Sequence, residues 1–581
     1  MNDSIFAMKI AGLWLVLFCC ALTGLTAPMT ASGLQEQSGR HAQRMYEVGH
    51  RVYGLIESAF RDAGMVLPEA AYPANGAQLL YYVRLLDSAS LSATGEAYAD
   101  QARRILGGWD GPGPVLAELA DDFSLEFEPL INLELRLDDE RPDKRVLDAP
   151  LDVLTLNSRV AMGPLWGEMQ FMLRQEPNHG RLSGESWSNV PGAVEWIDFN
   201  LPRRGYMSVG GERWSAQVGR DALAWGSSRS GSLTYSGEAD YLDFARLSTF
   251  YRWFSYSGVF LRLEPWVHVD ADPAEVPDGG RYAPPEGDYR SWRKSIVTHR
   301  FTFRPHERLR FSLMESAGVG GYAPDLRLFN PFMILHNHFD FTLMTFATSA
   351  ELTVVPLRGL ELYGQWYMND IMLPQEAEAG AVEPNAMAWL GGFQYQLPLD
   401  TSLARFGAEV FYSDPYVYIR ESVLRSFTYR HRVHTNYDGS GGESLGNIEW
   451  HDGFLGSPFG NDSLALVLFG GIELLNTAGL ELEFVRHHDG EKGASDILIP
   501  GAAAVEESTP TGTPQYVTQV TGVLSVSSAG FPQLVLPESM VLDTALTGRM
   551  QWIENVAHGK GDTAFRGAAS LSLGASWKFP Y

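Results

Sequence analysis

One long stretch with a period of two, residues 123–138, constrains the fold of this chain more than any other feature. Seven of the eight even positions are polar, and the odd positions carry Phe123, Leu125, Phe127, Pro129, Ile131, Leu133, Leu135 and Leu137. Successive side chains of a β-strand point to opposite faces, so this pattern predicts one apolar and one polar face. Strands of soluble sandwiches usually have about 5–6 residues. A tilted membrane strand of about 9–11 residues with extensions fits this length better.

The connections between the later strand-like segments alternate between short and long. Short connections are predicted at residues 305–307, 356–359, 398–400 and 476–479, and long polar stretches at 270–290, 374–386, 430–462 and 487–515. Membrane barrels of the outer-membrane type join their strands by short periplasmic turns and longer extracellular loops. The alternation therefore predicts antiparallel strands with their long loops at one end.

The predicted fold class is mainly β: a large transmembrane antiparallel β-barrel with a small N-terminal α-helical bundle. At roughly 25 residues per strand with its loop, residues 116–581 provide about 16–20 strands, an even number being usual. Such a barrel has room for a channel or an enclosed plug. Aromatic residues near strand ends, as at Trp253, Phe254, Tyr256, Trp366 and Tyr367, suggest interfacial girdles. A soluble all-β protein of two or three domains is the alternative.

Residues 1–33 are expected to be a secretory signal peptide. An apolar run at residues 10–25 follows Lys9, and small residues follow it through Ser32. Both cysteines, Cys19 and Cys20, lie in this run. The exported protein should therefore lack disulfides, thiolate metal sites and a cysteine nucleophile. The sequence after this segment has no apolar run of the roughly 20 residues that a membrane helix needs, which argues against a helical inner-membrane protein.

Residues 34–115 are expected to form a periplasmic helical segment. Apolar residues recur at helical spacing within residues 37–65, at Met45, Val48, Val52, Ile56 and Phe60. A second helix is predicted around residues 79–86, and a third at residues 98–106, ending at Gly107 and Gly108. Three helices of this size have little stability alone, so we expect them to pack on something larger.

The last strand indicates the destination of the chain. Apolar residues at odd positions from Leu571 to Tyr581 alternate with mostly small or polar ones. An amphipathic strand that ends in an aromatic residue resembles the sorting signal of the outer-membrane barrel assembly machinery. The expected location is the bacterial outer membrane, with outer-membrane lipid and that machinery as partners.

Charge and motifs exclude several functions. A net charge of −26 argues against nucleic acid as a partner, because phosphate binding needs a basic surface. The sequence contains no catalytic, metal-binding or dinucleotide-binding signature, so no enzyme activity, metal or cofactor is predicted. The histidine pairs His336/His338 and His487/His488 are interpreted as polar lumen or loop residues.

Two stretches stand out as candidate ligand-binding sites. The first contains Arg220, Asp221, Trp225 and Arg229, in a strand followed by a Ser/Gly-rich loop; the second contains Asn330 and, downstream, His336. Arginine beside a carboxylate, with aromatic rings for sugar faces, can contact a polysaccharide. The same charges can equally neutralise one another inside a barrel. Both interpretations stay open.

These stretches also resemble a known family, the Wzi-type capsule-assembly proteins. The resemblance lies in segments 202–206, 218–221, 225–226, 229–231 and 456–463, with Asp243, Asn330, Pro331 and His336, and extends from about residue 40 to the end. It implies an 18-stranded barrel with its helical bundle on the periplasmic side. It also implies a role in holding capsular or other surface polysaccharide at the cell exterior. Arg220, Asp221, Trp225, Gly226, Arg229 and Gly231 match the motif, as ligand residues or as fold determinants.

Two functions therefore stand against each other. The first is a non-enzymatic protein that assembles or attaches surface polysaccharide, its suspected partner. The alternative is a porin-like diffusion channel or specific transporter, whose excess of acid would favour cations.

Overall fold

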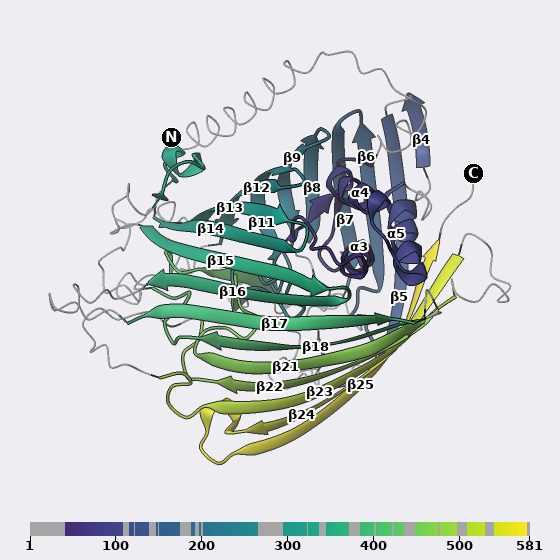
Figure 1. Ribbon diagram of the computed structural model, residues 1–581. Helices are drawn as coiled ribbons and strands as arrows, with labels where there is room; N and C mark the ends of the chain where they lie inside the picture. The colour runs from purple at the N-terminus through teal and green to yellow at the C-terminus, as the bar shows by residue number, and fades with distance from the viewer. Residues whose placement is uncertain are drawn as a thin grey trace, which may run out of the picture.

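The structure is a computed structural model that shows one closed barrel with a helical unit at one end (Figure 1). It describes residues 41–107, 115–120, 123–138, 147–148, 150–174, 188–191, 197–198, 202–264, 294–321, 323–335, 344–370, 384–399, 402–420, 423–434, 448–474, 477–494, 496, 508–528 and 540–577. The predicted signal peptide, residues 1–33, and the terminal Tyr581 lie outside these residues.

Eighteen strands of the described chain close the barrel, each antiparallel to its neighbours. The first nine are β5 (Phe123–Leu137), β6 (Leu154–Met162), β7 (Leu165–Leu173), β8 (Arg204–Gly210), β9 (Trp214–Asp221), β11 (Leu242–Phe250), β12 (Phe254–Leu263), β13 (Lys294–His306) and β14 (Leu309–Gly320). The others are β15 (Met344–Leu357), β16 (Leu360–Asp370), β17 (Ala386–Pro398), β18 (Ser402–Ser413), β21 (Ser463–Leu474), β22 (Ala478–Asp489), β23 (Gln515–Ser527), β24 (Met540–Glu554) and β25 (Thr563–Trp577).

The barrel closes where the last strand meets the first long one. β25 pairs with β5, with Leu571 opposite Leu135, and the short strand β4 (Val115–Ala120) pairs antiparallel with the first residues of β5. Closure pairs the two edges that an open sheet would leave exposed. The predicted barrel is confirmed, as is the favoured number of strands, and the four predicted short connections join consecutive strands.

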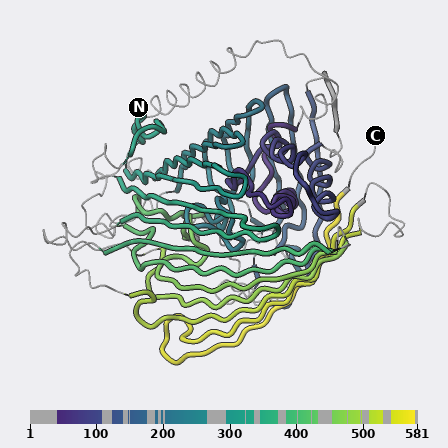
Figure 2. Tube along the Cα trace, in the orientation of Figure 1, coloured from purple at the N-terminus to yellow at the C-terminus, as the bar shows by residue number. Residues whose placement is uncertain are grey.

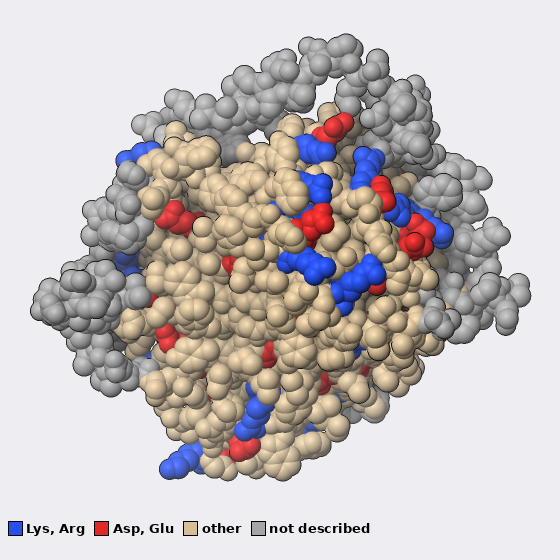
Figure 3. All heavy atoms as spheres, viewed as in Figure 1, with Lys and Arg blue, Asp and Glu red and all other residues tan. Residues whose placement is uncertain are grey.

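Alternation separates an apolar outer face from a polar lumen. On β5, Leu133 and Leu135 are exposed, whereas Glu134 and Arg136 are buried inside. Figure 3 shows a wide surface with few charges over the strands, and charged side chains gathered where the helices lie. This is the surface that lipid requires of a membrane barrel.

Aromatic residues mark both ends of the outer face. Trp366, Trp389 and Tyr412 lie opposite one another on β16, β17 and β18, toward the long-loop end. Toward the short turns, Phe303 lies between Phe254 and Phe311, at 5.4 and 5.1 Å between ring centroids, and is stacked on Phe311. One girdle prediction is wrong: Tyr367 is buried in the lumen, because it follows the outward Trp366 and alternation turns it inside.

Residues 41–107 form a compact unit at the short-turn end, which we call the helical unit. Its three helices are α3 (Arg51–Ala63), α4 (Gly76–Leu85) and α5 (Ala93–Leu106). Asn75 and Ser92 cap the N-termini of α4 and α5. Each side chain accepts a hydrogen bond from the backbone N–H three residues later, that of Gln78 or Gly95. Within the described residues, no helix is long and apolar enough to span a membrane.

The first predicted helix is wrong in its extent. Met45 and Tyr46 form the short strand β1 (Met45–Tyr46), which pairs with β3 (Ala74–Asn75). Gly49 then adopts a positive φ of 83°, and α3 begins only after the capping residue His50. A glycine in this conformation turns the chain where a helix cannot continue. Apolar spacing alone therefore extended the helix too far.

The helical unit is tied to three short turns of the barrel. Val66 N donates to Glu307 O at 2.7 Å, Gly359 N donates to Arg61 O at 2.8 Å, and Thr94 Oγ1 donates to Leu399 O at 3.0 Å. Figure 2 shows this purple segment lying within the mouth of the barrel. The expectation that the helices pack on a larger body agrees with these contacts. The exact boundaries of residues 34–115 and 116–581 stay a prediction.

Candidate functional site

The connection between β9 and β11, residues 222–241, folds into the lumen; we call it the inner loop. Its strand β10 (Ala224–Trp225) pairs with β2 (Ala71–Tyr72) of the helical unit, and Gly226 N donates to Ala70 O at 2.7 Å. Gly226 has a φ of 124°, and a Cβ there would lie 2.1 Å from Gln365 Nε2. The turn into the lumen therefore requires glycine at this position.

A buried carboxylate on the wall holds the tip of the inner loop. Glu409 of β18 accepts hydrogen bonds from Arg229 N at 2.7 Å, Ser230 N at 3.1 Å and Ser228 Oγ at 3.0 Å. Tyr363 donates its hydroxyl to the same carboxylate at 2.6 Å. Four donors thus converge on one anion, which fixes the loop tip with the strong hydrogen bonds that charge provides.

The connection between β18 and β21 covers the inner loop from the long-loop end. It contains the hairpin of β19 (Thr428–His434) and β20 (Ile448–Phe454), and we call its described part, residues 414–420, 423–434 and 448–462, the outer cap. Ser236 N donates to Leu455 O at 2.8 Å, and Ser457 N donates to Ser232 O at 2.7 Å. The inner loop is therefore held between the helical unit and the outer cap.

Buried ion pairs attach the helical unit to the lumen wall. Glu351 accepts from Arg310 at 2.7 Å and Arg300 at 3.2 Å, and Arg300 also contacts Glu69 of the helical unit at 3.0 Å. All four side chains are buried. Such a cluster requires every charge to have its partner, because an unpaired ion inside the protein is costly. On the β11–β18 side the lumen is thus filled and fixed.

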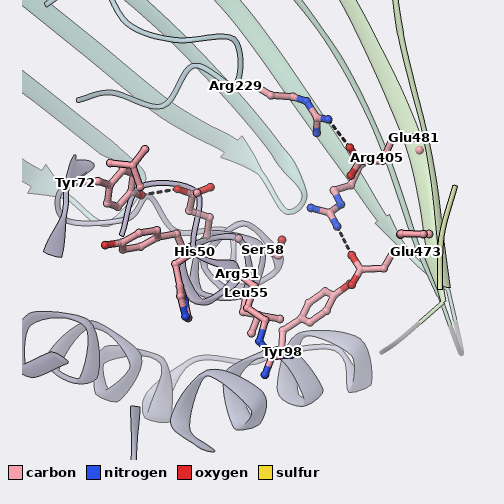
Figure 4. A pocket seen from close by; sticks show the side chains of 18 of the residues that line it. His50, Arg51, Leu55, Ser58, Tyr72, Tyr98, Arg229, Arg405, Glu473 and Glu481 are labelled. Atoms are coloured by element: carbon pink, nitrogen blue, oxygen red, sulfur yellow. Dashed lines mark hydrogen bonds and ion pairs between the residues drawn. The ribbon is translucent and has the colours of Figure 1, made fainter. Parts of the chain in front are cut away.

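A cavity of about 1480 Å³ lies on the other side of the lumen. The helical unit and the inner loop form one of its walls, and strands β5, β17, β18 and β21–β25 form the other. Figure 4 shows Arg229 from the inner loop and Arg405 from β18 pointing at Glu481 and Glu473 on the barrel wall. Arg229 contacts Glu481 at 2.6 Å, and Arg405 pairs with Glu473. These four side chains are all partly exposed to the cavity.

Glu238 and His50 are among the groups on the helical and loop side of the cavity whose pKa is shifted. Burial, followed by the nearby Asp148 and Asp240, raises the pKa of Glu238. Burial also lowers the pKa of His50 to about 3, with Arg44 and Arg51 adding to the effect. His50 is therefore a neutral imidazole at pH 7, and its Nδ1 accepts from Val52 N at 3.2 Å.

The structure brings four of the predicted site residues onto one segment but gives them different surroundings. Asp221 and Trp225 are buried, Asp221 against Arg204 and Trp225 against Tyr235. Only Arg229 has its charged group at the cavity. Arg220 is half-buried on the outer face of β9, paired with Asp243 at 2.8 Å. Ligand binding by these four residues stays a prediction.

The second predicted pair, Asn330 and His336, is not placed beside these four residues by the structure. Asn330 is exposed in the loop between β14 and β15, where its Oδ1 accepts from Phe332 N at 3.1 Å. His336 lies outside the described residues. The described residues contain no group of three His, Cys, Asp or Glu side chains that could hold a metal ion.

Several cavity residues were missed by reasoning from sequence: Arg405, Glu473, Glu481, Glu483 and Asp543. A signal for them existed, because Glu481 and Glu483 alternate with the outward Leu480 and Leu482 along β22. Such alternation assigns a side chain to the lumen. It does not tell which part of the lumen stays open.

Comparisons with known proteins agree with this architecture. Residues 197–531 match the family model described as capsule assembly protein Wzi. A search of curated proteins gives no significant match. Among solved structures, the chain is similar to Wzi of Escherichia coli, described as an outer-membrane carbohydrate-binding β-barrel involved in group 1 capsule assembly. The TM-score is 0.54 at 13% identity, over 92% of this chain and 99% of that one.

Two other solved structures align with lower scores. OccK3 of Pseudomonas aeruginosa aligns with a TM-score of 0.36 at 11% identity, over 80% of this chain and 97% of its own. OprD of the same organism aligns with a TM-score of 0.38 at 10% identity, over 80% and 96%. The family match covers more than half of the sequence, and the barrel has the apolar outer face that a membrane requires. The chain therefore belongs to the Wzi family of capsule assembly proteins and is an outer-membrane β-barrel.

Proposed function

We propose that this protein is a non-enzymatic factor that holds surface polysaccharide during capsule assembly. The observation that carries the proposal is that the lumen is filled on the β11–β18 side and keeps a cavity on the other. The inner loop is fixed between the helical unit and the outer cap, and buried ion pairs attach the helical unit to the wall. A barrel filled in this way favours a binding scaffold over a diffusion pore.

The cavity supplies groups that suit a sugar chain. A saccharide presents many hydroxyls, which hydrogen-bond to carboxylates, guanidinium groups and serine side chains. The cavity walls carry all three, as in Arg229, Glu481 and Ser572. Its volume of about 1480 Å³ exceeds the roughly 300–1,000 Å³ of sites for small ligands, so it can hold several sugar units. The printed description of Escherichia coli Wzi as carbohydrate-binding supports this proposal.

A binding experiment with matched variants tests the role of the cavity. Purified protein is applied to an array of bacterial surface polysaccharides and capsule fragments. Arg229→Gln and Glu481→Gln each remove one side of an ion pair at the cavity, and we expect binding to fall about tenfold, on the order of one charged hydrogen bond. Arg103→Gln is the control, because Arg103 pairs with Asp87 and Asp100 on the exposed face of α5, outside the cavity. Equal binding by all three variants would contradict the cavity site.

A genetic experiment tests the function itself. Cells without the gene should lose retained capsule, and expression of the full chain should restore it. Unchanged surface polysaccharide in the deletion strain would remove the proposed function, whatever the array shows. Polysaccharide recovered after incubation with the protein should keep its length, since we assign the protein no catalytic step.

A further inference from the structure

The outer wall of the barrel has one region where outward side chains are covered. Phe260, Val297, Ala317 and Phe346 lie opposite one another across β12, β13, β14 and β15. Thr298 and Arg300, which alternate with Val297 and His299, face the lumen, where Thr298 bonds to Tyr235 and Arg300 to Glu69. The row that contains Val297 therefore faces outward, where lipid would be expected.

Val297, Ala317 and Phe346 of this row are nevertheless buried, and Phe260 is partly buried. Val297 is 1% exposed, whereas Leu313, also outward on the neighbouring strand, is 48% exposed. The cover is the described loop 323–335 between β14 and β15, which includes the 3-10 helix η5 (Leu326–Phe329). Leu328 and Leu335 of the loop pack on this row. The loop thus folds back over the outside of the barrel.

Two polar side chains of the wall are satisfied by the loop. His299 Nε2 donates to Leu328 O at 2.7 Å, and its Nδ1 accepts from the Tyr256 hydroxyl at 2.9 Å. Glu315 Oε2 accepts from Leu335 N at 3.0 Å. Histidine and glutamate facing outward would lack partners in hydrocarbon, where water is absent. The loop backbone supplies those partners and satisfies two of its own polar groups.

The depth of this region lies within the lipid-facing band. Val297 is six residues along β13 from Phe303, which belongs to the aromatic row near the short turns. With about 3.3 Å per residue and a strand tilt of roughly 40°, Val297 lies about 15 Å above that row. On β15, Phe346 lies four residues beyond Ala350, which is opposite Trp366, so the region reaches the outer end of an apolar band about 25 Å tall. The long-loop end is the extracellular end, so this depth corresponds to the outer leaflet.

The surface that the loop presents to its surroundings is apolar. Phe332 is 90% exposed, and Leu326 and Ile334 are also exposed. The charges Asp325 and Arg327 pair with each other at 2.8 Å, and Asn330 is bonded to the loop backbone. The exposed apolar side chains thus continue the lipid-facing surface of β14 and β15.

We propose that loop 323–335 is a lipid-binding element that lies against the barrel wall and places Leu326, Phe332 and Ile334 among the acyl chains of the outer leaflet. It widens the apolar girth of the barrel on the β12–β15 side. It also shields His299 and Glu315 from hydrocarbon. Asn330, predicted from sequence as a sugar ligand, then lies at the outer surface beside lipid.

Spin labelling of single cysteines tests the proposal. The only cysteines in the sequence are Cys19 and Cys20, in the predicted signal peptide, so an introduced cysteine in the exported chain is labelled alone. Phe332→Cys is compared with Leu313→Cys, a lipid-facing control, and Lys560→Cys, an exposed control between β24 and β25. The full chain is reconstituted into phosphatidylcholine vesicles, and collisions of each label with oxygen and with a water-soluble nickel chelate are measured.

The outcomes distinguish lipid, water and protein as the surroundings of the label at position 332. We expect the label at position 332 to match that at 313 within about twofold, with frequent oxygen collisions and few nickel collisions, because oxygen concentrates in hydrocarbon. A label that matches position 560 would place the loop in water and overturn the proposal. An immobilised label with few collisions of either kind would show a protein partner on the patch and would also overturn it.

Discussion

At the scale of single residues, Glu351 has the most demanding role in the lumen. It is the shared partner of Arg300 and Arg310, and all three side chains are buried. Removing the carboxylate takes the 2.7 Å anionic partner from Arg310 and leaves Arg300 with Glu69 alone of its two carboxylates. Breaking a buried pair costs about 3–5 kcal/mol, so Glu351→Ala should lower the free energy of unfolding by that amount. Urea unfolding of the protein in vesicles, followed by tryptophan fluorescence, measures the loss.

The matched control is an exposed pair of the same chemistry. Asp100 on α5 contacts Arg103 at 2.6 Å, with both side chains well exposed. Exposed ion pairs contribute about 0–1 kcal/mol, so Asp100→Ala should leave the unfolding midpoint almost unchanged. Similar losses in both variants would mean that water reaches Glu351 and that the lumen is less tightly filled than the contacts indicate.

At the scale of elements, helix α3 connects pH to the docking of the helical unit. Its capping residue His50 is neutral when folded, with a pKa lowered to about 3, and it titrates near 6.5 when unfolded. Between these values the unfolded chain binds the extra proton. Folding stability should therefore fall as pH drops below about 6.5, by about 1–2 kcal/mol at pH 5.

Limited trypsin cleavage after Arg51 measures this loosening at pH 7.5 and pH 5. His50→Asn is the matched variant, because asparagine caps a helix without titrating in this range. It should cap α3 at both pH values and remove most of the pH dependence. If the variant loosened as much as the parent protein, groups other than His50 would control the change.

The elements also show how far the sequence alone could go. Strands such as β5 and β22 were predictable, because alternation is a local property of the residues. The short turns were predictable for the same reason. The inner loop was not, since its place in the lumen depends on Glu409, about 180 positions away from Arg229. The outward fold of loop 323–335 likewise depends on His299 and Glu315, which belong to two different strands.

The candidate site also contains residues that the sequence predicts and residues that depend on distant contacts. Arg229 could be chosen from its motif, but its partner Glu481 comes from a strand more than 250 positions later. Motif residues such as Asp221 and Trp225 looked like ligand groups because their types suit sugar binding. The structure buries both, so their chemistry is used within the protein. Composition and spacing cannot show which polar residues become buried, because that depends on long-range contacts.

At the scale of the whole molecule, the filled lumen and the cavity lead to one prediction about ion flow. The helical unit lies within the short-turn end of the barrel and forms one wall of the cavity, whose other wall carries Glu473, Glu481, Glu483 and Asp543. The full chain in a planar bilayer should show little steady conductance. Removing residues 41–107 should open that end and produce a conductance that favours cations, because carboxylates then line the opened space.

The two proteins must be compared at the same salt concentration, with the reversal potential across a potassium chloride gradient giving the selectivity. Glu481→Gln and Glu483→Gln in the shortened chain should reduce the preference for cations, since both carboxylates face the opened space. Large steady currents through the full chain would favour the porin alternative, because the helical unit would then fail to block the path. Weak currents through both chains would place the barrier in the inner loop and outer cap, which the shortened chain keeps. The position of the barrier thus decides whether the helical unit or the folded loops make this barrel a binding scaffold.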